Sequence, residues 1–548
     1  MQGQVSRRSF LKTALAGASA FAAPSAFLTL APGAVAAPGQ PVPPISMMYY
    51  GNWPEIVELF RKAAQDFRKI GLTPQLNPAP SSVAVPKTLQ QHDYGDWGSI
   101  LWGATPERID PNFYLEEMLS SKSKRNYGYY NNPKYDEAVK AQQEEMDPGK
   151  RAALVKSAQA IAAADYPIWW LAHPVVISAY NQKFFANVEE ILGAGYGNMY
   201  SIWNYLNITP KTARKTLRVG LEIEINTLNP FTAPTSPNQQ FMRFFYDTFA
   251  VIGPDREPHP RAAESWKTVG PKTVDVKLRQ GMKFHDGKPV TGEDVAFTFA
   301  YLRKWDFPFF RSALEVIENV EVKDYDIRFH LKRPYAPFFA NVLSWLFILP
   351  KHVWQDIPEK AGVKNPGEYQ NPKPIGSGPF VFGHWRKGQE IYFKANKEHP
   401  LAPKVDDVYF VLIPSVDGNA GALDRGEIDL TQQTLTPALA DQLAQNPEVK
   451  VGYAPSHAVY EVRPDLRKAP FNDVSFRKAI YHAWDRRPII NYFAGKAIAS
   501  GNTPITPILK QWHNADLKAP EYDLDKARKV LKDAGYTWNS DGQLVMPA

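Results

Sequence analysis

The stretch from Lys283 to Val295 constrains the fold most, because its residue types predict a strand end, a turn and a helix start in one short run. Asp286-Gly287 is typical of a turn, since glycine tolerates positive φ, and Pro289 cannot continue a ladder of strand hydrogen bonds. Thr291 then predicts a helix N-cap, with Asp294 as the reciprocal acceptor of a capping box. A strand, a turn and a capped helix in sequence indicate a mixed α/β protein.

Composition sets the size of the core and excludes several classes of site. A chain of 548 residues with 44% hydrophobic residues can bury a large core, and its length predicts three or four domain-sized units. The net charge of +7 comes without any cluster of Lys and Arg interleaved with aromatic residues, so no nucleic-acid partner is expected. Cysteine is absent, which excludes disulfides, thiolate metal sites, covalent haem and a lipidated amino-terminal Cys.

The first 36 residues have the pattern of an export signal. Arg7-Arg8 lies in the run Ser6 to Lys12, an Ala-rich apolar stretch follows, and Ala34-Val35-Ala36 is a small-residue cleavage pattern. The paired arginines, with Phe10 and Leu11 behind them, resemble a twin-arginine signal, while a plain secretory signal is the alternative. Either interpretation predicts a periplasmic protein that is not a lipoprotein, and no later apolar run approaches the roughly 20 residues that span a bilayer.

Beyond the signal, strands and helices alternate, as expected of an α/β protein. Helices are expected after the caps Asp147, Asp473 and Asp523. Residues 209–215 are expected to be a polar connector. The expected strands are Ile45 to Tyr50, Trp97 to Trp102, Tyr166 to Tyr180, Leu217 to Ile225 and Leu544 to Met546, and further helices are expected from Pro54, near Asn112 to Leu119 and from about Pro133.

Motifs of catalysis and of metal binding are missing from the sequence. It has no His-Glu-x-x-His pair, no P-loop and no Gly-x-Ser-x-Gly elbow, and its eleven histidines show no ligand spacing. Gly193-Ala194-Gly195-Tyr196-Gly197 does not follow a strand and open a helix as a dinucleotide site requires. We therefore expect no catalytic residues, no metal site and no cofactor.

Several separate stretches resemble one family, the family 5 solute-binding proteins of ABC importers, its peptide- and nickel-binding group. The resemblance is strongest in "KFHDGKPVTGEDVAFTFAYL", and it recurs in "HPRAAESW", "PIGSGPFVF", "ALDRGEIDL" and "APFNDVSFRKAIYHAWDR". It implies a two-lobe α/β periplasmic binding protein fold of type II, in the large cluster with an extra subdomain. It also implies a monomer that captures a small molecule or peptide between its lobes and delivers it to a membrane ABC permease. The alternative is an exported periplasmic enzyme.

The resemblance also implies positions for ligand-binding residues. Trp102-Gly103-Ala104-Thr105 resembles the loop that ends, in peptide-binding members, in an Asp holding the peptide's amino terminus. Thr105 stands at that position, so an amine would lose a charge-assisted partner. We expect Trp102 to pack flat on the ligand.

Two further segments are expected at the ligand. Pro237-Asn238-Gln239 resembles the pocket loop of the nickel-binding branch, which implies ligand contacts from Thr235, Ser236 and Asn238. Tyr460 and Arg463 lie on an inferred strand between the lobes, where Arg463 is expected to meet an anionic group.

The order of the segments predicts a circular permutation. In the family that the chain resembles, the segment "TLRVGLEIEINTLNP" comes near the mature amino terminus, but here it begins at Thr216, and "GYYNNPKYDEAV", which belongs near the carboxyl end, precedes it. The expected domains are therefore the signal at 1–36, the first part of lobe II at 37–180, lobe I with the extra subdomain at 181–455, and the second part of lobe II at 456–548. Lobe II is then built from both ends of the chain.

Overall fold

Helix α7 (Gly292–Trp305) begins where the capping box predicts it. The Thr291 backbone N–H and hydroxyl donate to the Asp294 carboxylate at 2.9 and 3.0 Å, and Gly287 in the preceding turn has φ +87°. The strand expected before the turn is only an isolated bridge between Lys283 and Pro289, because the chain folds back at once and the Phe284 N–H bonds the Lys288 carbonyl at 2.7 Å.

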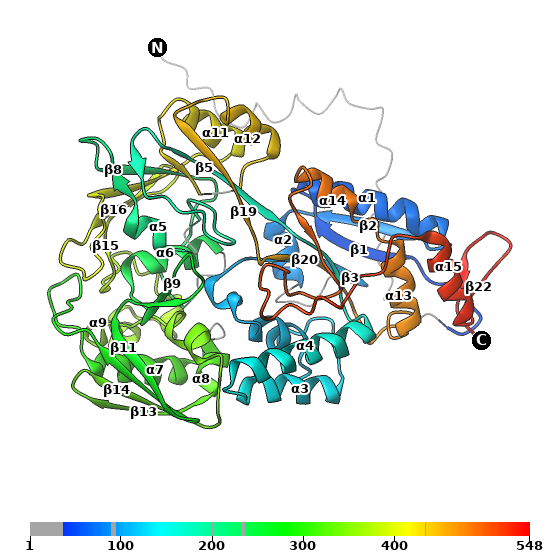
Figure 1. The fold of residues 1–548 in the computed structure, drawn as a ribbon, viewed down its shortest axis with the longest axis horizontal. Helices are drawn as coiled ribbons and strands as arrows, with labels where there is room; N and C mark the ends of the chain where they lie inside the picture. Colours follow the sequence, from blue (N-terminus) through cyan, green and yellow to red (C-terminus); the bar gives the residue numbers. More distant parts are fainter. Residues whose placement is uncertain (1–36, 89–94, 199–200, 232–235, 308–309, 433) are drawn as a thin grey trace, which may run out of the picture. The chain divides into compact units, whose positions relative to one another are not determined.

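The computed structural model describes residues 37–548 apart from 89–94, 199–200, 232–235, 308–309 and 433 (Figure 1). The expected export signal, residues 1–36, lies outside the described residues. Within the described part no helix combines the length and the apolar character that crossing a membrane requires.

A six-stranded sheet has the order β2-β1-β3-β20-β4-β21. Strands β1, β2 and β3 are parallel to one another, and β20 and β4 continue the sheet with antiparallel pairing. Both ends of the chain therefore contribute to one sheet. Its strands are β1 (Ile45–Tyr50), β2 (Pro74–Ala79), β3 (Trp97–Trp102), β4 (Trp169–His173), β20 (Val459–Pro464) and β21 (Ile498–Ala499).

A seven-stranded sheet has the order β15-β16-β17-β8-β18-β5-β19. It consists of β5 (Val175–Asn181), β8 (Thr216–Leu221), β15 (Phe380–Arg386), β16 (Glu390–Ala395), β17 (Asp407–Leu412), β18 (Leu430–Thr431) and β19 (Val449–Pro455). The expected single strand from Tyr166 to Tyr180 was wrong: Pro174, which has no N–H to donate, separates β4 from β5, and the two strands join different sheets.

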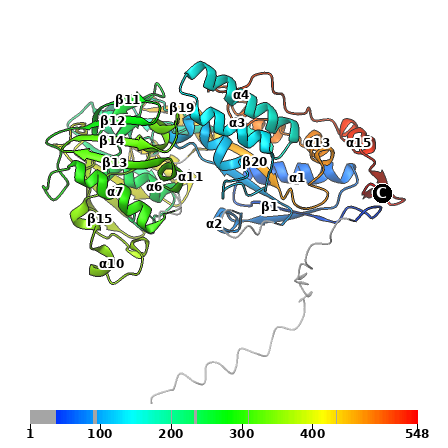
Figure 2. The ribbon, with the colours of Figure 1, turned by 90° about the horizontal axis from the view of Figure 1, so that it is seen from below.

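A four-stranded antiparallel sheet lies beside α7, and Figure 2 shows its strands in the order β11, β12, β14, β13. These strands are β11 (Ala263–Gly270), β12 (Thr273–Leu278), β13 (Ile317–Lys323) and β14 (Asp326–Leu331). A short hairpin precedes them, formed by β9 (Ala250–Ile252) and β10 (Pro258–Pro260). Its turn, residues 253–257, becomes part of the candidate site.

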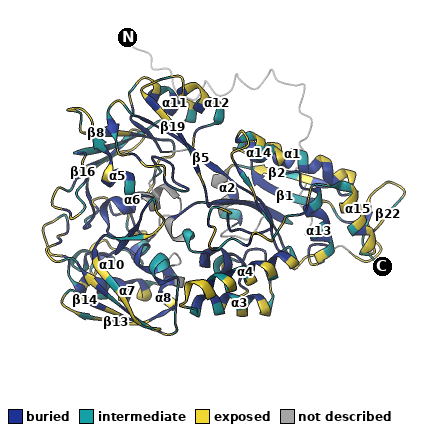
Figure 3. Ribbon diagram, viewed as in Figure 1, coloured by how far each residue is buried: buried dark blue, intermediate teal, exposed yellow. Residues whose placement is uncertain are grey.

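The helices carry exposed outer faces while strands such as β1 are buried (Figure 3). The longer helices are α1 (Pro54–Lys69), α3 (Pro133–Glu144), α4 (Pro148–Asp165), α6 (Ser236–Phe245), α11 (Val416–Asp424), α13 (Val474–Ala483) and α15 (Leu524–Asp533). Asp147, Asp473 and Asp523 cap their helices with side-chain hydrogen bonds, as predicted. The helix expected near Asn112 to Leu119 is a short π-helix, Phe113–Glu117.

Two clusters of buried hydrophobic residues form the core. One surrounds the six-stranded sheet and includes Phe60, Trp97, Trp169 and Trp484. The other includes residues of the seven-stranded and four-stranded sheets and is rich in phenylalanine. The expected connector at 209–215 starts as a short strand, β7 (Thr209–Pro210), paired with β6 (Phe185–Ala186), and leads directly into β8.

Residues near the two ends of the described chain are bonded to each other. The hairpin of β22 (Thr537–Trp538) and β23 (Leu544–Val545) bonds residues 40–42: the Val42 N–H donates to the Leu544 carbonyl at 2.7 Å and the Met546 N–H to the Gln40 carbonyl at 2.9 Å. The Leu544 N–H also bonds the Gly71 carbonyl at 2.8 Å. The strand expected at Leu544 to Met546 is thus paired rather than left as a free edge.

Candidate functional site

Two neighbouring strands pass from one main sheet to the other. Strand β5 pairs antiparallel with β19 in the seven-stranded sheet, and β4, which precedes β5, pairs antiparallel with β20, which follows β19. Pro174 makes the first crossing, and Ser456, His457 and Ala458 make the second. We call this region, residues 173–175 and 455–459, the crossing.

The crossing buries two histidines. Nδ1 of His173 lies 2.9 Å from the Ala458 carbonyl oxygen, and Nε2 of His457 lies 2.9 Å from the Thr105 carbonyl oxygen. A carbonyl can only accept, so each of these nitrogens carries the hydrogen. Burial lowers the pKa of both imidazoles to about 4, which keeps them neutral near pH 7. The second nitrogen of each ring is buried and has no partner among the described residues.

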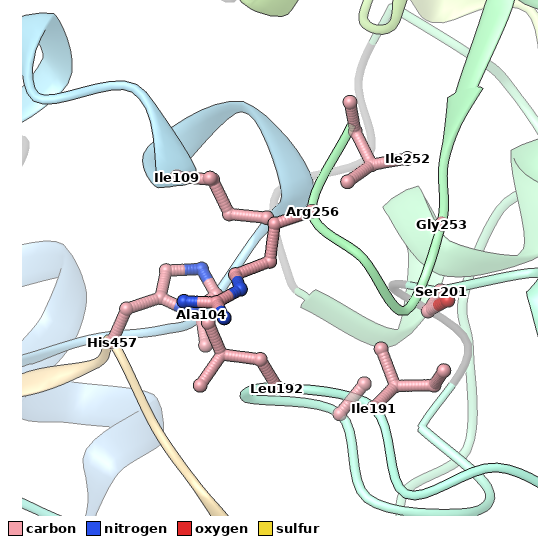
Figure 4. Close-up of a pocket in the computed structure, with 10 residues that line it drawn as sticks. Ala104, Ile109, Ile191, Leu192, Ser201, Ile252, Gly253, Arg256 and His457 are labelled. Atoms are coloured by element: carbon pink, nitrogen blue, oxygen red, sulfur yellow. The ribbon is translucent and has the colours of Figure 1, made fainter. Parts of the chain in front are cut away.

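A small pocket adjoins His457 and opens to solvent; its cavity volume is about 20 Å³, room for little more than one water molecule. Residues of several separate segments reach it (Figure 4). Its apolar lining consists of Ala104, Ile109, Ile191, Leu192, Ala194 and Ile252. Its other lining residues are Ser201, Gly253, Arg256 and His457.

The turn at residues 191–195 forms one wall by close approach to the crossing. Gly193 has φ +72°, and a Cβ there would lie 2.8 Å from both Cε1 and Nδ1 of His457 and would collide with Ala104. The Gly193 N–H donates to the Pro455 carbonyl at 2.8 Å, which anchors the turn to the end of β19. Glycine is therefore required by the backbone conformation and by the space available.

Arg256 reaches the pocket from the turn between β9 and β10. Its φ is +72°, in the left-handed region that favours glycine. Its N–H bonds the Gly253 carbonyl at 3.0 Å, and one guanidinium N–H bonds the Ile508 carbonyl at 3.1 Å. The side chain is exposed, and no acidic group pairs with it among the described residues. It therefore places an unpaired positive charge at the pocket.

Residues 257–547, more than half of the chain, match the family model described as bacterial extracellular solute-binding proteins, family 5 middle. The chain belongs to this family. The oligopeptide-binding protein AppA of Bacillus subtilis is 33% identical over 290 residues, which are 52% of this chain and 52% of AppA. The dipeptide-binding protein of Escherichia coli is 28% identical over 299 residues, 50% of this chain and 55% of the relative. The chain spans about half the length of the curated relatives that it matches.

Solved structures of similar fold are found as well. The structure of Bacillus subtilis AppA in complex with a nonapeptide aligns with a TM-score of 0.50 and 27% identity, covering 60% of this chain and 66% of AppA. An oligopeptide-binding protein of Thermotoga maritima aligns with a TM-score of 0.51 and 21% identity, covering 60% and 65% of the two chains, and shows the fold alone. The mixed α/β fold is thus that of the two-lobe family 5 binding proteins.

Of the four residues expected in the first family 5 loop, only Ala104 lines the pocket. Trp102 is 6% exposed and lies in an aromatic cluster, stacked on Tyr127 with ring centroids 6.3 Å apart and edge-on to Phe113 at 5.5 Å. Thr105 is buried, and its carbonyl rather than its side chain bonds His457. The carbonyl of Gly103 accepts a hydrogen bond from Arg108. This loop therefore contributes one lining residue, Ala104, and holds the His457 ring through the Thr105 carbonyl.

Tyr460 and Arg463 are buried on opposite faces of β20 and do not line the pocket. The Tyr460 hydroxyl donates to Glu55 at 2.8 Å. Arg463 is 1% exposed: it pairs with Glu461 at 2.8 Å and donates to the carbonyls of Met118 and Arg125. Burial raises the pKa of Glu461, and the charge of Arg463 opposes that rise. The guanidinium expected to meet an anionic ligand is thus already bonded inside the protein.

The last three expected ligand residues cannot be placed against the pocket. Thr235 lies outside the described residues, and Ser236 and Asn238 fall in the first turn of α6, where only the backbone is described. Their contact with ligand stays a prediction.

The residues that do form the pocket were largely missed from the sequence. His457 is a lone histidine in an apolar run, and Arg256 is one of many surface arginines. The only usable signal was the Gly-Ala-Gly run at 193–195, which indicates a tight turn with close backbone approach rather than a dinucleotide site. Within the described part no group of three or more His, Cys, Asp or Glu could hold a metal ion.

Proposed function

We propose that this protein is the solute-binding component of an ABC importer, which captures a small organic solute, peptide-like or other, and delivers it to a membrane permease. The observation that carries this proposal is the pocket at the crossing, lined by residues from both of the regions that the crossing joins, in a chain of family 5. A site shared in this way closes when the two regions move together. AppA and its relatives, which are named for binding oligopeptides or dipeptides, support the same function.

The lobes proposed for this motion follow the sequence-based boundaries. Lobe II comprises 37–180 and 456–548, lobe I comprises 181–455 with the four-stranded sheet as its extra subdomain, and the crossing is the hinge. The two main sheets support this division, although β5 (Val175–Asn181) pairs in the seven-stranded sheet. The first hydrophobic cluster extends across the boundary, since it also includes Ala420, Leu423 and Leu443. We include a monomeric state in the proposal. The exported-enzyme alternative gains no support from the family assignment, so we do not propose it.

Scattering and mass spectrometry test the binding function together. Native mass spectrometry of protein purified under mild conditions identifies a retained solute, and removal of that solute should increase the radius of gyration. A protein that retains no solute and keeps the same dimensions with every candidate ligand would contradict the proposal. A retained redox cofactor would restore the enzyme alternative.

Export by the twin-arginine route is proposed on the Arg7-Arg8 pattern and on the extracellular character of the family. Replacing both arginines by lysine, Arg7→Lys with Arg8→Lys, keeps the positive charge of the segment and should leave the protein in the cytoplasm. A secretory signal of the general type would tolerate both changes, so unaltered export of the double variant would favour that alternative.

A circular permutation is proposed on the order of the segments. The family match covers 257–547, yet four of the six strands of the six-stranded sheet, β1 to β4, come before it in the chain. The hydrogen bonds between residues 39–42 and 544–547 support the proposal, because they hold these two segments side by side. A rejoined protein that starts at Lys215, continues from 548 through a short linker to residue 40 and ends near Pro210 should fold and bind. Failure of that protein to fold would overturn the permutation.

A further inference from the structure

A polar contact joins the two proposed lobes at a place apart from the crossing. On one side is helix α3, and on the other is the segment 333–341, which follows β14. The Ala336 N–H donates to the Gln143 carbonyl at 2.8 Å, and a guanidinium N–H of Arg333 donates to Oε1 of Gln143 at 2.7 Å. Figure 1 shows α3 at the lower edge of the molecule, below the strands β5 and β19 that lead to the crossing. We call this contact the latch; its residues are Asn112, Glu116 and Gln143 on lobe II and Arg333, Tyr335, Ala336 and Asn341 on lobe I.

The Tyr335 hydroxyl is shared between the two sides of the latch. It accepts a hydrogen bond from the side-chain amide of Asn112 at 3.3 Å and another from that of Asn341 at 3.0 Å. Tyr335 and Asn112 are each 1% exposed. Oδ1 of Asn112 also accepts from the amides of Gln142 and Gln143, at 2.8 and 2.9 Å. A buried network whose members bond one another fixes the two surfaces in one register.

The latch connects two separate cores. Leu115 and Val139 belong to the hydrophobic cluster around the six-stranded sheet, whereas Phe338 and Val342 belong to the other cluster. The bonds that join the two sides are hydrogen bonds, which water can replace when the surfaces part, so each contributes only modestly to holding them together. An apolar core that continued across the boundary would have no such replacement. The contact is therefore suited to being made and broken.

Glu116 makes the latch sensitive to pH. Its Oε2 accepts a hydrogen bond from the Asn112 amide at 2.9 Å. Burial raises the pKa of Glu116 to about 7; Asn112 and Arg333 oppose this rise, and the charges of Glu117 and Glu315 add to it. Parting the two sides exposes Glu116 to water and returns its pKa toward the ordinary 4.5. Between pH 4.5 and 7 the closed arrangement thus binds a proton that the open one releases, and closure weakens as the pH rises through this range.

We propose that the latch fastens the two lobes in their closed arrangement: closing forms the hydrogen bonds from the segment 333–341 to Gln143 and Asn112, and opening breaks them. The crossing connects the lobes, and the latch determines what fraction of the molecules is closed. This inference rests on the proposed binding function, because it concerns the lobe motion by which a solute is captured and released.

Amide hydrogen exchange at Ala336 measures the latch directly. The Ala336 N–H is bonded across the latch, and Pro334 and Pro337, which have no N–H, isolate its signal in a short peptide. The Lys332 N–H bonds the Val316 carbonyl at 3.0 Å within lobe I and is the internal control. Mass spectrometry of the exchanging protein at pH 7.5 should find both amides protected. Exchange of Ala336 at the rate of an unstructured peptide would overturn the inference.

An arginine variant with a matched control tests the contact across the lobes. Arg333→Gln removes the charged donor and should speed the exchange of Ala336 on the order of tenfold, with Lys332 unchanged. Arg328→Gln, on β14, removes a pair with Asp275 inside the four-stranded sheet and should change neither amide. Equal exchange of Ala336 in Arg333→Gln and in the parent would overturn the latch. A parallel rise at Lys332 would do so too, since it would assign Arg333 to the stability of lobe I.

The ratio of the two exchange rates tests the role of Glu116. Because both amides share the same chemical dependence on pH, the ratio of Ala336 to Lys332 reports the opening of the latch alone. In the parent this ratio should rise severalfold between pH 5 and 7.5, and in Glu116→Gln, which keeps an acceptor for Asn112 but cannot titrate, it should stay level. An equal rise in both proteins would remove Glu116 from the latch.

X-ray scattering separates this inference from the binding function. Without solute, the double variant Arg333→Gln with Tyr335→Phe should have a larger radius of gyration than the parent, and it should retain less solute on purification. If the parent retains a solute but the double variant keeps the parent's dimensions, the latch is overturned and the binding function stands. If the variant opens the molecule and neither protein retains a solute, the latch stands and the binding function loses its support.

Discussion

The molecule surrounds a buried histidine with charged groups in two places, and the two surroundings differ. In the first, Asp247 lies between His399 and Arg261: Arg261 Nε donates at 2.6 Å, and His399 Nε2 lies 3.2 Å away. Nδ1 of His399 accepts the Leu401 N–H at 3.0 Å, so both ring nitrogens are used. In the second, His457 and Arg256 line one pocket that has no carboxylate among its described lining residues, and one imidazole nitrogen has no partner among the residues that the structure describes.

The two groups use the same residue types, but the first has its hydrogen-bond partners within the protein and is structural, whereas the second lacks some of them and belongs to the candidate site. The group around Asp247, which we call the closed cluster (Asp247, Arg261, His399), satisfies its own charges and ties together the segments before β9, before β11 and after β16. In the second group, which we call the open pair (Arg256, His457), the guanidinium has no acidic partner and Nδ1 of the imidazole has no partner among the described residues. A buried polar group is informative about ligands only when the protein does not satisfy it.

The largest expected effect comes from opening the closed cluster. Asp247→Ala leaves a buried arginine uncompensated and should lower the free energy of unfolding by about 3 to 5 kcal/mol. Chemical denaturation measures the loss. Asp255→Ala removes a mostly exposed partner of His259 and is the control, with an expected loss below about 1 kcal/mol. Similar losses of the free energy of unfolding in the two variants would mean that the closed cluster stabilises the fold no more than an exposed ion pair does.

The buried histidines of the crossing and Asp247 of the closed cluster should make the free energy of unfolding depend on pH in different ranges. The folded pKa of His457 and of His173 is about 4, below the ordinary 6.5. The unfolded chain therefore binds their protons first, and stability falls as pH drops from 6.5 to 4, by up to about 3 kcal/mol for each ring. Burial alone would raise the pKa of Asp247, but His399 and Arg261 lower it to about 2, so its contribution is lost only between pH 3.8 and 2.

Urea denaturation across pH 2 to 8 checks these ranges. The His457→Gln variant should flatten the decline between pH 6.5 and 4, and a decline of unchanged depth would show that this ring is not kept neutral by the fold.

A smaller effect is expected from the wall of the pocket. Gly193→Ala combines positive φ with a collision against Ala104 and His457, and should cost about 2 kcal/mol of stability and weaken ligand binding. Gly388→Ala has positive φ but open space around it, so it measures the backbone strain alone, about 1 kcal/mol. If both variants lose the same stability, the 191–195 turn is not pressed against the crossing.

The smallest effect has the opposite sign for stability and for binding. Arg256→Gly relieves the left-handed conformation and should stabilise the fold by up to about 1 kcal/mol, while binding of the retained solute falls. Thermal unfolding and calorimetry on one preparation measure both quantities. A variant that loses stability and keeps binding would assign Arg256 to the fold rather than to the ligand.

Local structure was predictable where one segment determines it. Strands β1 and β3 have the predicted bounds, and the caps at Asp147, Thr291, Asp473 and Asp523 start their helices, because capping and periodicity act over a few residues. The break at Pro174 was missed, since its consequence depends on which sheets the two strands join.

The site was predicted less well, because the hydrogen-bond partners of a buried polar side chain come from segments far away in the sequence. Arg463 suggested an anion site, but Glu461 and the carbonyls of Met118 and Arg125 already bond it. His457 suggested nothing, although Thr105, 352 positions earlier, determines which of its nitrogens is available. Only the three-dimensional structure shows which arginine or imidazole already has its partners within the protein.

The crossing has a mechanical consequence. A single connecting segment lets two bodies rotate about it, whereas two connecting segments side by side restrict that rotation. The hydrogen bond from His173 to the Ala458 carbonyl fastens the two segments together where they leave the sheets. In the closure proposed above, the two sheets would therefore approach each other mainly by bending at the crossing.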